Sequence, residues 1–365
     1  MSQRAVLIRQ IVFLLLVLFG FFVGLDLMGL GFKLMGKGFA EALIERTANP
    51  FVGLFIGILA TTLVQSSSTT TSMTVGLVAA GALTIEGAIP IIMGANIGTS
   101  VTNTLVSLGH VTRREEFQRA FAGATIHDFF NWMAVAILLP IELATGYLAR
   151  LSSYVQSMVE GAGGIALFNP LREIVRPVSQ ELSGLLGESG GIVLALGIAL
   201  LMACLKLLVD LLKALMSGRA EQILHRTLFR SVWAAIFAGV AMTVMVQSSS
   251  ITTSVMVPLV GAGVVSLAQL FPFTIGANIG TTITAMLAAL ATGHPAAVTV
   301  AFAHLFFNLS AAALIYLPPP VRAIPIALAA ALGRFGSRNR VLAGVYILLV
   351  FYGVPILLLL VSGTL

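Results

Sequence analysis

The stretch VQSSSTTTSM (residues 64–73) places seven consecutive hydroxyl side chains, Ser66 to Ser72, directly after the apolar run GLFIGILATTLV (53–64). Seven successive side chains on a helix point in every direction, so neighbouring helices could hardly give every hydroxyl a partner. Unpaired polar groups at membrane depth are costly. Some of these hydroxyls are therefore expected to face a polar cavity.

Composition identifies the surroundings of this stretch as a membrane. Of 365 residues, 58% are hydrophobic and 9% are charged, and the mean hydropathy is +1.03, far outside the range of soluble domains. Apolar runs at 11–32, 190–212, 298–317 and 341–361 approach or reach the ~20 residues that a helix needs to cross a bilayer. The run at 11–32 is too long for a signal peptide and is interpreted as a retained first span.

The net charge of +6 is attributed to the excess of Lys and Arg in the cytoplasmic loops of membrane proteins rather than to a nucleic-acid partner. The predicted topology has the N-terminus, 110–119, 213–231 and 321–340 inside, and 33–46, 141–188 and 292–297 outside. The inside segments then hold thirteen Lys and Arg and the outside segments six, while Lys206 is left within a span. This asymmetry predicts a cytoplasmic N-terminus.

Internal repetition relates two parts of the chain. The segment QSSSTTTS (65–72) returns as QSSSITTS (247–254), and GANIGTS (94–100) returns as GANIGTT (276–282), both 182 residues later. In the predicted topology the chain approaches the first copy outward and the second copy inward, so the repeats are inverted. Inverted repeats that meet at the bilayer midplane are typical of secondary transporters.

These patterns predict an all-α polytopic integral membrane protein with two inverted-topology repeats, re-entrant hairpins and discontinuous helices. Residues 1–140 form the first repeat half, with the first span, the QSSS hairpin, a broken GANIGT helix and the HDFFN helix. Residues 141–188 form an extracytoplasmic interfacial linker, 189–320 the second half, and 321–365 a basic loop and a final span.

The two GANIGT segments are predicted to interrupt helices. Gly94 and Gly98, like Gly276 and Gly280, can unwind the backbone, and the following threonine can start a new helix. The same glycines also spell GxxxG, the close-packing motif of membrane helices, but the Asn and Thr beside both copies favour a site. Backbone N–H groups there suit an anion, and freed carbonyl and hydroxyl oxygens suit a hard cation such as sodium.

Charge counting favours cation-coupled transport of an anion. Between Thr47 and Thr112 there is no Lys or Arg, and between Ser231 and Val321 there is no charged residue. An anion bound there is not expected to rely on an arginine clamp, so cations bound beside it would supply the compensating charge.

The QSSS pair, the GANIGT pair and RAFAGATIHDFFNW (119–132) resemble the type II sodium-dependent phosphate cotransporter family over 27–140 and 200–317. The short, cysteine-free segment 141–188 resembles a bacterial-type member. The resemblance implies sodium-coupled symport of inorganic phosphate by alternating access across the bacterial cytoplasmic (inner) membrane. It implies no enzyme activity, no cofactor besides sodium as the coupling ion, and no transition metal. The expected partners are phosphate, sodium and the lipid bilayer, and nucleic acid is not expected to bind. Whether the protein forms a homodimer stays open.

The resemblance, extended to both repeats, also implies site residues. Phosphate is expected at Ser66, Ser67, Ser248, Ser249, Asn96 and Asn278. Sodium is expected at Gln65, Gln247, Ser248, Thr99, Thr281 and Thr284. The family's serine before the second Asn-Ile-Gly is Ala277 here, so the coupling stoichiometry stays open.

A second repeated motif is expected to support the site from nearby helices. His127 and Asn131, like His304 and Asn308, are spaced i, i+4 and share a helix face, which favours hydrogen bonds between helices. Asp128 has no counterpart in the second half. As an ionisable group within a span, it is a candidate for cation or proton coupling.

Other functions stay open at this point. Within the transporter class, the substrate could be another small anion, and the mode could be proton-coupled or exporting. A channel would need a continuous polar stripe, whereas the polar groups cluster between apolar runs. A membrane phosphatase would need a base beside a serine, and only His127 with Asp128 could approach one in space.

Overall fold

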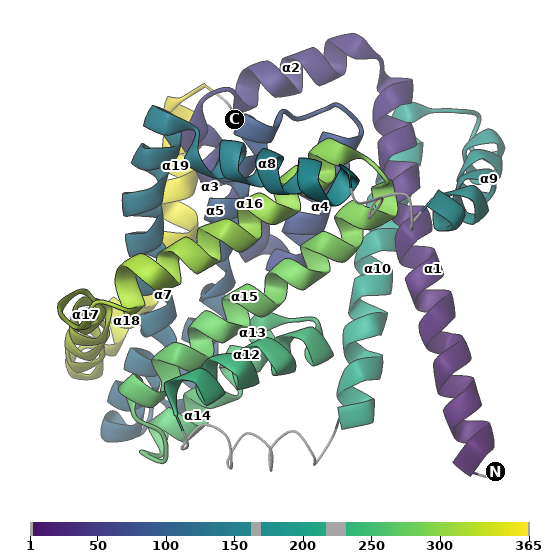
Figure 1. Ribbon diagram of the computed structural model, residues 1–365. Coiled ribbons are helices and arrows are strands. Elements are labelled where there is room, and N and C mark those ends of the chain that lie inside the picture. Colours follow the sequence, from purple (N-terminus) through teal and green to yellow (C-terminus); the bar gives the residue numbers. More distant parts are fainter. Residues whose placement is uncertain (1–2, 162–168, 217–230, 364–365) are drawn as a thin grey trace.

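The computed structural model describes residues 3–161, 169–216 and 231–363, and every regular element in these ranges is a helix (Figure 1). Seven of the described helices are long and apolar enough to cross a membrane. These spans are Val12–Met35, Ile85–His110, Arg114–Thr145, Gly190–Leu207, Leu267–Thr292, Pro295–Tyr316 and Arg340–Val361. The predicted all-α polytopic membrane fold is confirmed.

The elements follow one another in two comparable series. The first series is α1 (Gln3–Met35), α2 (Lys37–Thr47), α3 (Pro50–Val64), α4 (Ser67–Ala79), α5 (Ile85–Thr99), α6 (Val101–Ser107), η1 (Leu108–His110) and α7 (Arg114–Thr145). The second series is α10 (Gly190–Met216), α12 (Val232–Val246), α13 (Ser249–Ser254), α14 (Met256–Gly261), α15 (Leu267–Thr292), α16 (Pro295–Ala311) and η3 (Ala312–Tyr316).

The remaining helices join and follow the two series. The predicted linker contains α8 (Tyr147–Gly161) and α9 (Asn169–Leu185), and the C-terminal part contains α17 (Pro319–Arg338), α18 (Arg340–Leu348), η4 (Leu349–Gly353) and α19 (Val354–Val361). Residues 162–168 of the predicted linker and 217–230 of the predicted inside segment 213–231 lie outside the described residues. The N-terminal end of α1 lies at one end of the molecule and α2, α8 and α9 lie at the other (Figure 1). Which end is cytoplasmic stays a prediction.

Two short helices, α3 and α12, cannot cross the bilayer alone. Each has 15 residues, and at 1.5 Å per residue a helix of this length covers ~22 Å of the ~30 Å hydrocarbon core. Helix α3 is also bent by 98° from the end of α2. In Figure 1 the α3–α4 hairpin lies in the half that contains α2, and α12–α14 lie in the opposite half. This arrangement is compatible with re-entrant hairpins, while the inverted relation of the halves stays a prediction.

Glycines hold each short helix against its neighbour. A methyl group on Gly57 of α3 would overlap the carbonyl oxygen of Ile91, and one on Gly94 of α5 would overlap that of Leu54. The second half repeats the arrangement, with Gly239 against Phe273 and Gly276 against Ile236. The backbones therefore approach to a distance that only glycine allows.

These contacts correct the prediction that GANIGT interrupts its helices. Helix α5 continues through Gly94–Gly98 to Thr99, and α15 runs unbroken through Gly276–Thr284. The glycines serve packing, and the helical backbone is kept because adjacent carbonyls leave no room for a Cβ. Breaks with a left-handed residue lie at the two QSSS segments, between α3 and α4 and between α12 and α13, where the hairpins are predicted, and in the first half Ser100 also separates α5 from α6.

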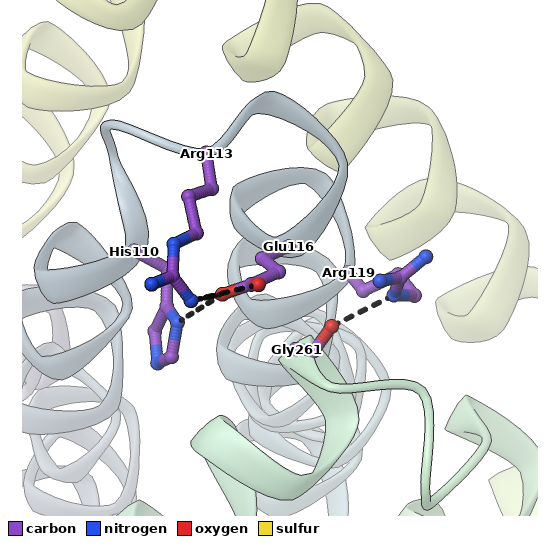
Figure 2. A network of polar contacts seen from close by, with 5 residues as sticks. All are labelled: His110, Arg113, Glu116, Arg119 and Gly261. Atoms are coloured by element: carbon purple, nitrogen blue, oxygen red, sulfur yellow. Dashed lines mark hydrogen bonds and ion pairs between the residues drawn. The ribbon is translucent and has the colours of Figure 1, made fainter.

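Polar contacts at the start of α7 also connect the two halves. Glu116 lies in the first turn, where a carboxylate is favoured by the helix dipole, and it accepts hydrogen bonds of 3.0 and 3.2 Å from Arg113 Nη1 (Figure 2). Arg119 Nε donates to the carbonyl oxygen of Gly261 at 2.8 Å (Figure 2). That carbonyl lies at the end of α14, where helix carbonyls lack intrahelical partners, so Arg119 fixes the tip of the second hairpin to α7.

Candidate functional site

The two helix breaks have nearly the same backbone conformation. Gln65 has φ 57° and ψ 28°, and Gln247 has φ 54° and ψ 27°. The following serines are extended, at φ −153° for Ser66 and φ −154° for Ser248. A left-handed conformation is uncommon for residues other than glycine, costs about 1–2 kcal/mol and concentrates at functional sites. Both breaks are therefore held by the surrounding structure.

Each serine caps the helix that follows. The hydroxyl oxygen of Ser66 accepts a hydrogen bond from Thr69 N at 3.2 Å, and that of Ser248 accepts one from Ile251 N at 3.3 Å. These contacts satisfy one free N–H group of each new helix. The repeated serine thus starts α4 and α13 in the same way.

Each glutamine amide connects its own break to a neighbouring helix of the same half, α6 for Gln65 and α15 for Gln247. Nε2 of Gln247 donates to Val244 O at 2.6 Å, and its Oε1 accepts from Thr284 Oγ1 at 2.7 Å. Nε2 of Gln65 donates to the carbonyl of Thr62 at 2.6 Å, and its Oε1 accepts from Thr102 Oγ1 at 2.9 Å. Thr102 precedes Thr284 by 182 residues, so the repeat shift could have identified it, although the sequence analysis did not.

The two breaks line one cavity of about 460 Å³. Its uncharged polar lining is Gln65, Ser66, Ser68, Thr69, Gln247 and Ser248. Its apolar lining is Val64, Met202, Ala203, Leu205 and Ile251. A hydrogen bond of 3.4 Å from Ser68 Oγ to the carbonyl of Gln247 joins the halves beside it. The expectation that part of the hydroxyl run faces a polar cavity is confirmed for Ser66, Ser68 and Thr69.

Of the other hydroxyls of the run, Thr70 and Thr71 bond to the backbone of their own helix, whereas the buried hydroxyl of Ser72 has no hydrogen-bond partner among the described residues. Thr71 donates to Ser67 O at 2.9 Å, and Thr253 donates to Ser249 O at 2.8 Å. Thr70 accepts from Thr61 Oγ1 of α3 at 2.9 Å. Bonds to the carbonyl four residues earlier satisfy hydroxyls that point away from the cavity.

Several predicted site residues lie outside the cavity lining. Ser67 and Ser249 are buried at the starts of α4 and α13. Thr99 and Thr281 donate to the carbonyl oxygens of Ala95 and Ala277, at 2.8 and 3.1 Å. These four residues do not line the cavity, and their contacts with ions stay a prediction.

The predicted network around the first repeated histidine is present and connects the halves. His127 Nε2 lies 2.7 Å from Asn278 Oδ1, and Asn278 Nδ2 donates to Asn131 Oδ1 at 2.8 Å. Asn131 Nδ2 in turn donates to Asn96 O at 2.6 Å. Asn278 joins this buried network through its side chain and Asn96 through its backbone carbonyl, while the Asn96 side chain donates to Ile92 O at 2.9 Å, and neither residue lines the cavity. Asn103, which the sequence analysis missed, links His127 Nδ1 (3.3 Å) to the hydroxyls of α13.

The second repeated histidine does not form the equivalent network. His304 is 1% exposed, and neither of its ring nitrogens has a hydrogen-bond partner among the described residues. Asn308 donates only to the carbonyl of His304, at 3.1 Å. The prediction of bonds between helices is therefore correct for His127 and Asn131 and wrong for His304 and Asn308 in this arrangement.

Asp128 is buried and points away from this network toward the C-terminal helices. Its Oδ2 accepts a hydrogen bond of 2.8 Å from the hydroxyl of Tyr346 in α18. It lines neither the cavity nor a break, so its predicted role in coupling stays a prediction.

Replacing Tyr346 with phenylalanine tests this contact. The variant Tyr346→Phe is expected to lower the free energy of unfolding by about 1–3 kcal/mol, because it leaves a buried carboxyl oxygen of Asp128 without its hydrogen-bond donor. The matched control is Tyr147→Phe, whose hydroxyl meets Ser310 Oγ at 3.0 Å at an exposed position, and it should change stability by less than about 0.5 kcal/mol. Denaturation in detergent measures both, and equal effects would contradict the buried bond.

The cavity also contains a charge that the sequence analysis did not expect. Lys206 of α10 lines it together with both QSSS segments. The sequence analysis expected no basic side chain at the anion site, because it considered only the residues near the QSSS and GANIGT motifs. This expectation is wrong because α10, which precedes the second repeat, packs beside both breaks.

Comparison with known proteins agrees with these features. The model of the Na+/Pi-cotransporter family matches residues 20–167 and 200–317. Sodium-dependent phosphate transport protein 2A of Ovis aries is 35% identical over 97% of this chain and 68% of its own length. The corresponding values are 33%, 96% and 65% for protein 2B of Pongo abelii, and 36%, 93% and 65% for protein 2A of Rattus norvegicus.

The chain thus spans about two thirds of the length of these relatives. No solved structure matches it. The family match covers both QSSS segments and both GANIGT segments, and more than half of the chain. The chain therefore belongs to the Na+/Pi-cotransporter family.

Proposed function

We propose that this protein carries out sodium-coupled symport of inorganic phosphate. The observation that carries the proposal is the convergence of two matched helix breaks, one from each repeat, on a single hydroxyl-lined cavity. Relatives named as sodium-dependent phosphate transport proteins supply the substrate and the coupling ion. We place the protein in the bacterial cytoplasmic membrane with the N-terminus inside, in keeping with the distribution of Lys and Arg.

Within the cavity, oxygen atoms suit sodium and hydroxyl and N–H donors suit phosphate. Gln247, Ser248 and Thr284 would hold a sodium ion in the second half, since their oxygens cluster at the break. Gln65 and Thr102 form the matching pair in the first half. Phosphate would bind between Ser66 and Ser248, where the N-terminal end of α4 adds a favourable dipole.

Alternating access would follow from exposing this cavity to one side at a time. Sodium binding would order the amide and hydroxyl oxygens and add positive charge, after which the phosphate anion binds. Uptake would then be driven by the sodium gradient.

Uptake into liposomes tests the proposal directly. Purified protein is reconstituted, and radiolabelled phosphate is added with an inward sodium gradient, or with potassium or proton gradients as controls. Uptake that requires sodium is the expected result. Uptake driven by a proton gradient, or no phosphate uptake by folded protein, would contradict sodium-coupled symport. Single-channel currents from the purified protein in lipid bilayers would favour a channel.

The hydrogen bond from Thr284 provides a test of the sodium site. The isosteric variant Thr284→Val is expected to raise the sodium concentration for half-maximal uptake about two- to tenfold, the equivalent of one hydrogen bond. Thr292→Val is the matched control, because Thr292 lies at the end of the same helix and its hydroxyl bonds only to nearby backbone, donating to Ala289 O at 2.7 Å and accepting from His294 N at 3.2 Å. Equal sodium dependence in both variants would remove Thr284 from the site.

A further inference from the structure

One charged side chain lies in the wall of the phosphate cavity. Lys206 extends from α10, a helix that belongs to neither QSSS hairpin, and the cavity lining includes it together with Ser66, Ser68 and Ser248. No acidic side chain of the described residues lines this cavity, and Lys206 forms no ion pair within residues 3–161, 169–216 and 231–363. The cavity therefore has an uncompensated positive charge.

The rest of the lining cannot neutralise an anion. Its polar members are hydroxyls and amides, which orient a ligand but contribute no net charge, and its other members are apolar. Lys206 is an exposed residue within the span Gly190–Leu207, where a charged side chain is costly unless it reaches water or an anion accompanies it. The ammonium group is a compact charge with three donors, which suits the oxygens of a phosphate.

We propose that Lys206 binds the transported phosphate and supplies the fixed positive charge of the site. This inference rests on the function proposed above and adds a residue that the repeated motifs do not contain. It implies that phosphate affinity depends on the charge at position 206 even when sodium is saturating. Lys206 would then neutralise part of the negative charge of phosphate, and bound sodium would neutralise the remainder.

A different role for Lys206 follows from its position near the end of a span. Lys206 precedes the last residue of the span Gly190–Leu207, so its long side chain could instead extend to the membrane surface. Such a lysine would affect insertion or stability but not the phosphate concentration for half-maximal uptake. The KM for phosphate therefore distinguishes the two roles.

The single native cysteine makes a charge-replacement experiment possible. Cys204 is the only cysteine in the chain, so Cys204→Ala gives a background in which Lys206→Cys introduces one reactive thiol. A 2-aminoethyl methanethiosulfonate reagent restores a positive charge there, and a 2-hydroxyethyl reagent adds a neutral group of similar size. Phosphate KM is measured in liposomes at saturating sodium, with Arg150→Gln, an exposed residue of α8, as the control for loss of a basic side chain.

The expected result is a phosphate KM raised about tenfold to a hundredfold by Lys206→Cys, corresponding to one charge-assisted hydrogen bond. The aminoethyl reagent should return it toward the background value, and the hydroxyethyl reagent should not. An unchanged KM, or equal recovery with both reagents, would overturn the assignment. Absence of sodium-dependent phosphate uptake in the Cys204→Ala background and the native chain would instead refute the proposed function itself.

Discussion

Gln247→Ala is expected to abolish sodium-dependent phosphate uptake while leaving a folded protein. The amide of Gln247 is the link between the break and α15, through Val244 O and Thr284 Oγ1. Removing it takes an oxygen from the proposed sodium site and leaves no bulky gap in the apolar core. The companion variant Ser248→Ala should have a similar effect, because it removes both a cap and a hydroxyl that lines the cavity.

The left-handed backbone of Gln247 allows the amide and the break to be separated. Alanine at φ 54° is strained, whereas glycine adopts this conformation at little cost. Gln247→Gly therefore keeps the break and removes only the amide. Loss of uptake in both variants, with unchanged elution in gel filtration, is the expected result. Normal transport by Gln247→Gly would show that only the backbone matters and would exclude the side chain from the sodium site.

Gly276→Ala is expected to have the largest effect on stability. A methyl group there would overlap the carbonyl oxygen of Ile236, and two packed backbones cannot separate without disturbing the whole α12–α15 contact. We expect a loss of about 3 kcal/mol or more in the free energy of unfolding, at or above the upper end for overpacked sites. Thermal denaturation in detergent measures it.

Gly344→Ala is the matched control for this variant. Gly344 is also within a helix, but nothing lies within 4 Å of an added methyl group there. Alanine should be neutral or slightly stabilising at that position, because it favours the helix. Similar melting temperatures for the two variants would contradict the close approach of α12 and α15.

Much of the fold could be predicted because membrane helices leave strong signals in composition and repetition. The apolar runs predicted the spans, and the 182-residue shift paired the two QSSS segments whose backbones agree within a few degrees. The repeats predict hairpins at the QSSS segments, but they do not predict which residue of each break is left-handed. From local conformational preference, a left-handed backbone conformation is expected at glycine. Here hydrogen bonds to neighbouring helices hold Gln65 and Gln247 in that conformation, and packing keeps the GANIGT glycines helical.

The composition of the cavity wall depended on packing that no local pattern reveals. Lys206 was recognised as a charge within a span, but which face of α10 meets the hairpins depends on the packing of distant segments. Thr102 could have been identified from Thr284 by the 182-residue shift between the repeats. Asn103, in contrast, bridges His127 and α13 only because the two halves fold together.

The glycine contacts also restrict how the paired helices can move relative to each other. Because the carbonyls of Ile91 and Leu54 press on Gly57 and Gly94, sliding α3 along α5 would bring larger residues against them. Each helix pair is thus locked in register and behaves as a stiff lever. A displacement at the outer end of such a lever is not absorbed by slippage but is transmitted to the break at its inner end. For the proposed alternating access, we therefore expect the cavity to open by rocking of one helix pair against the other.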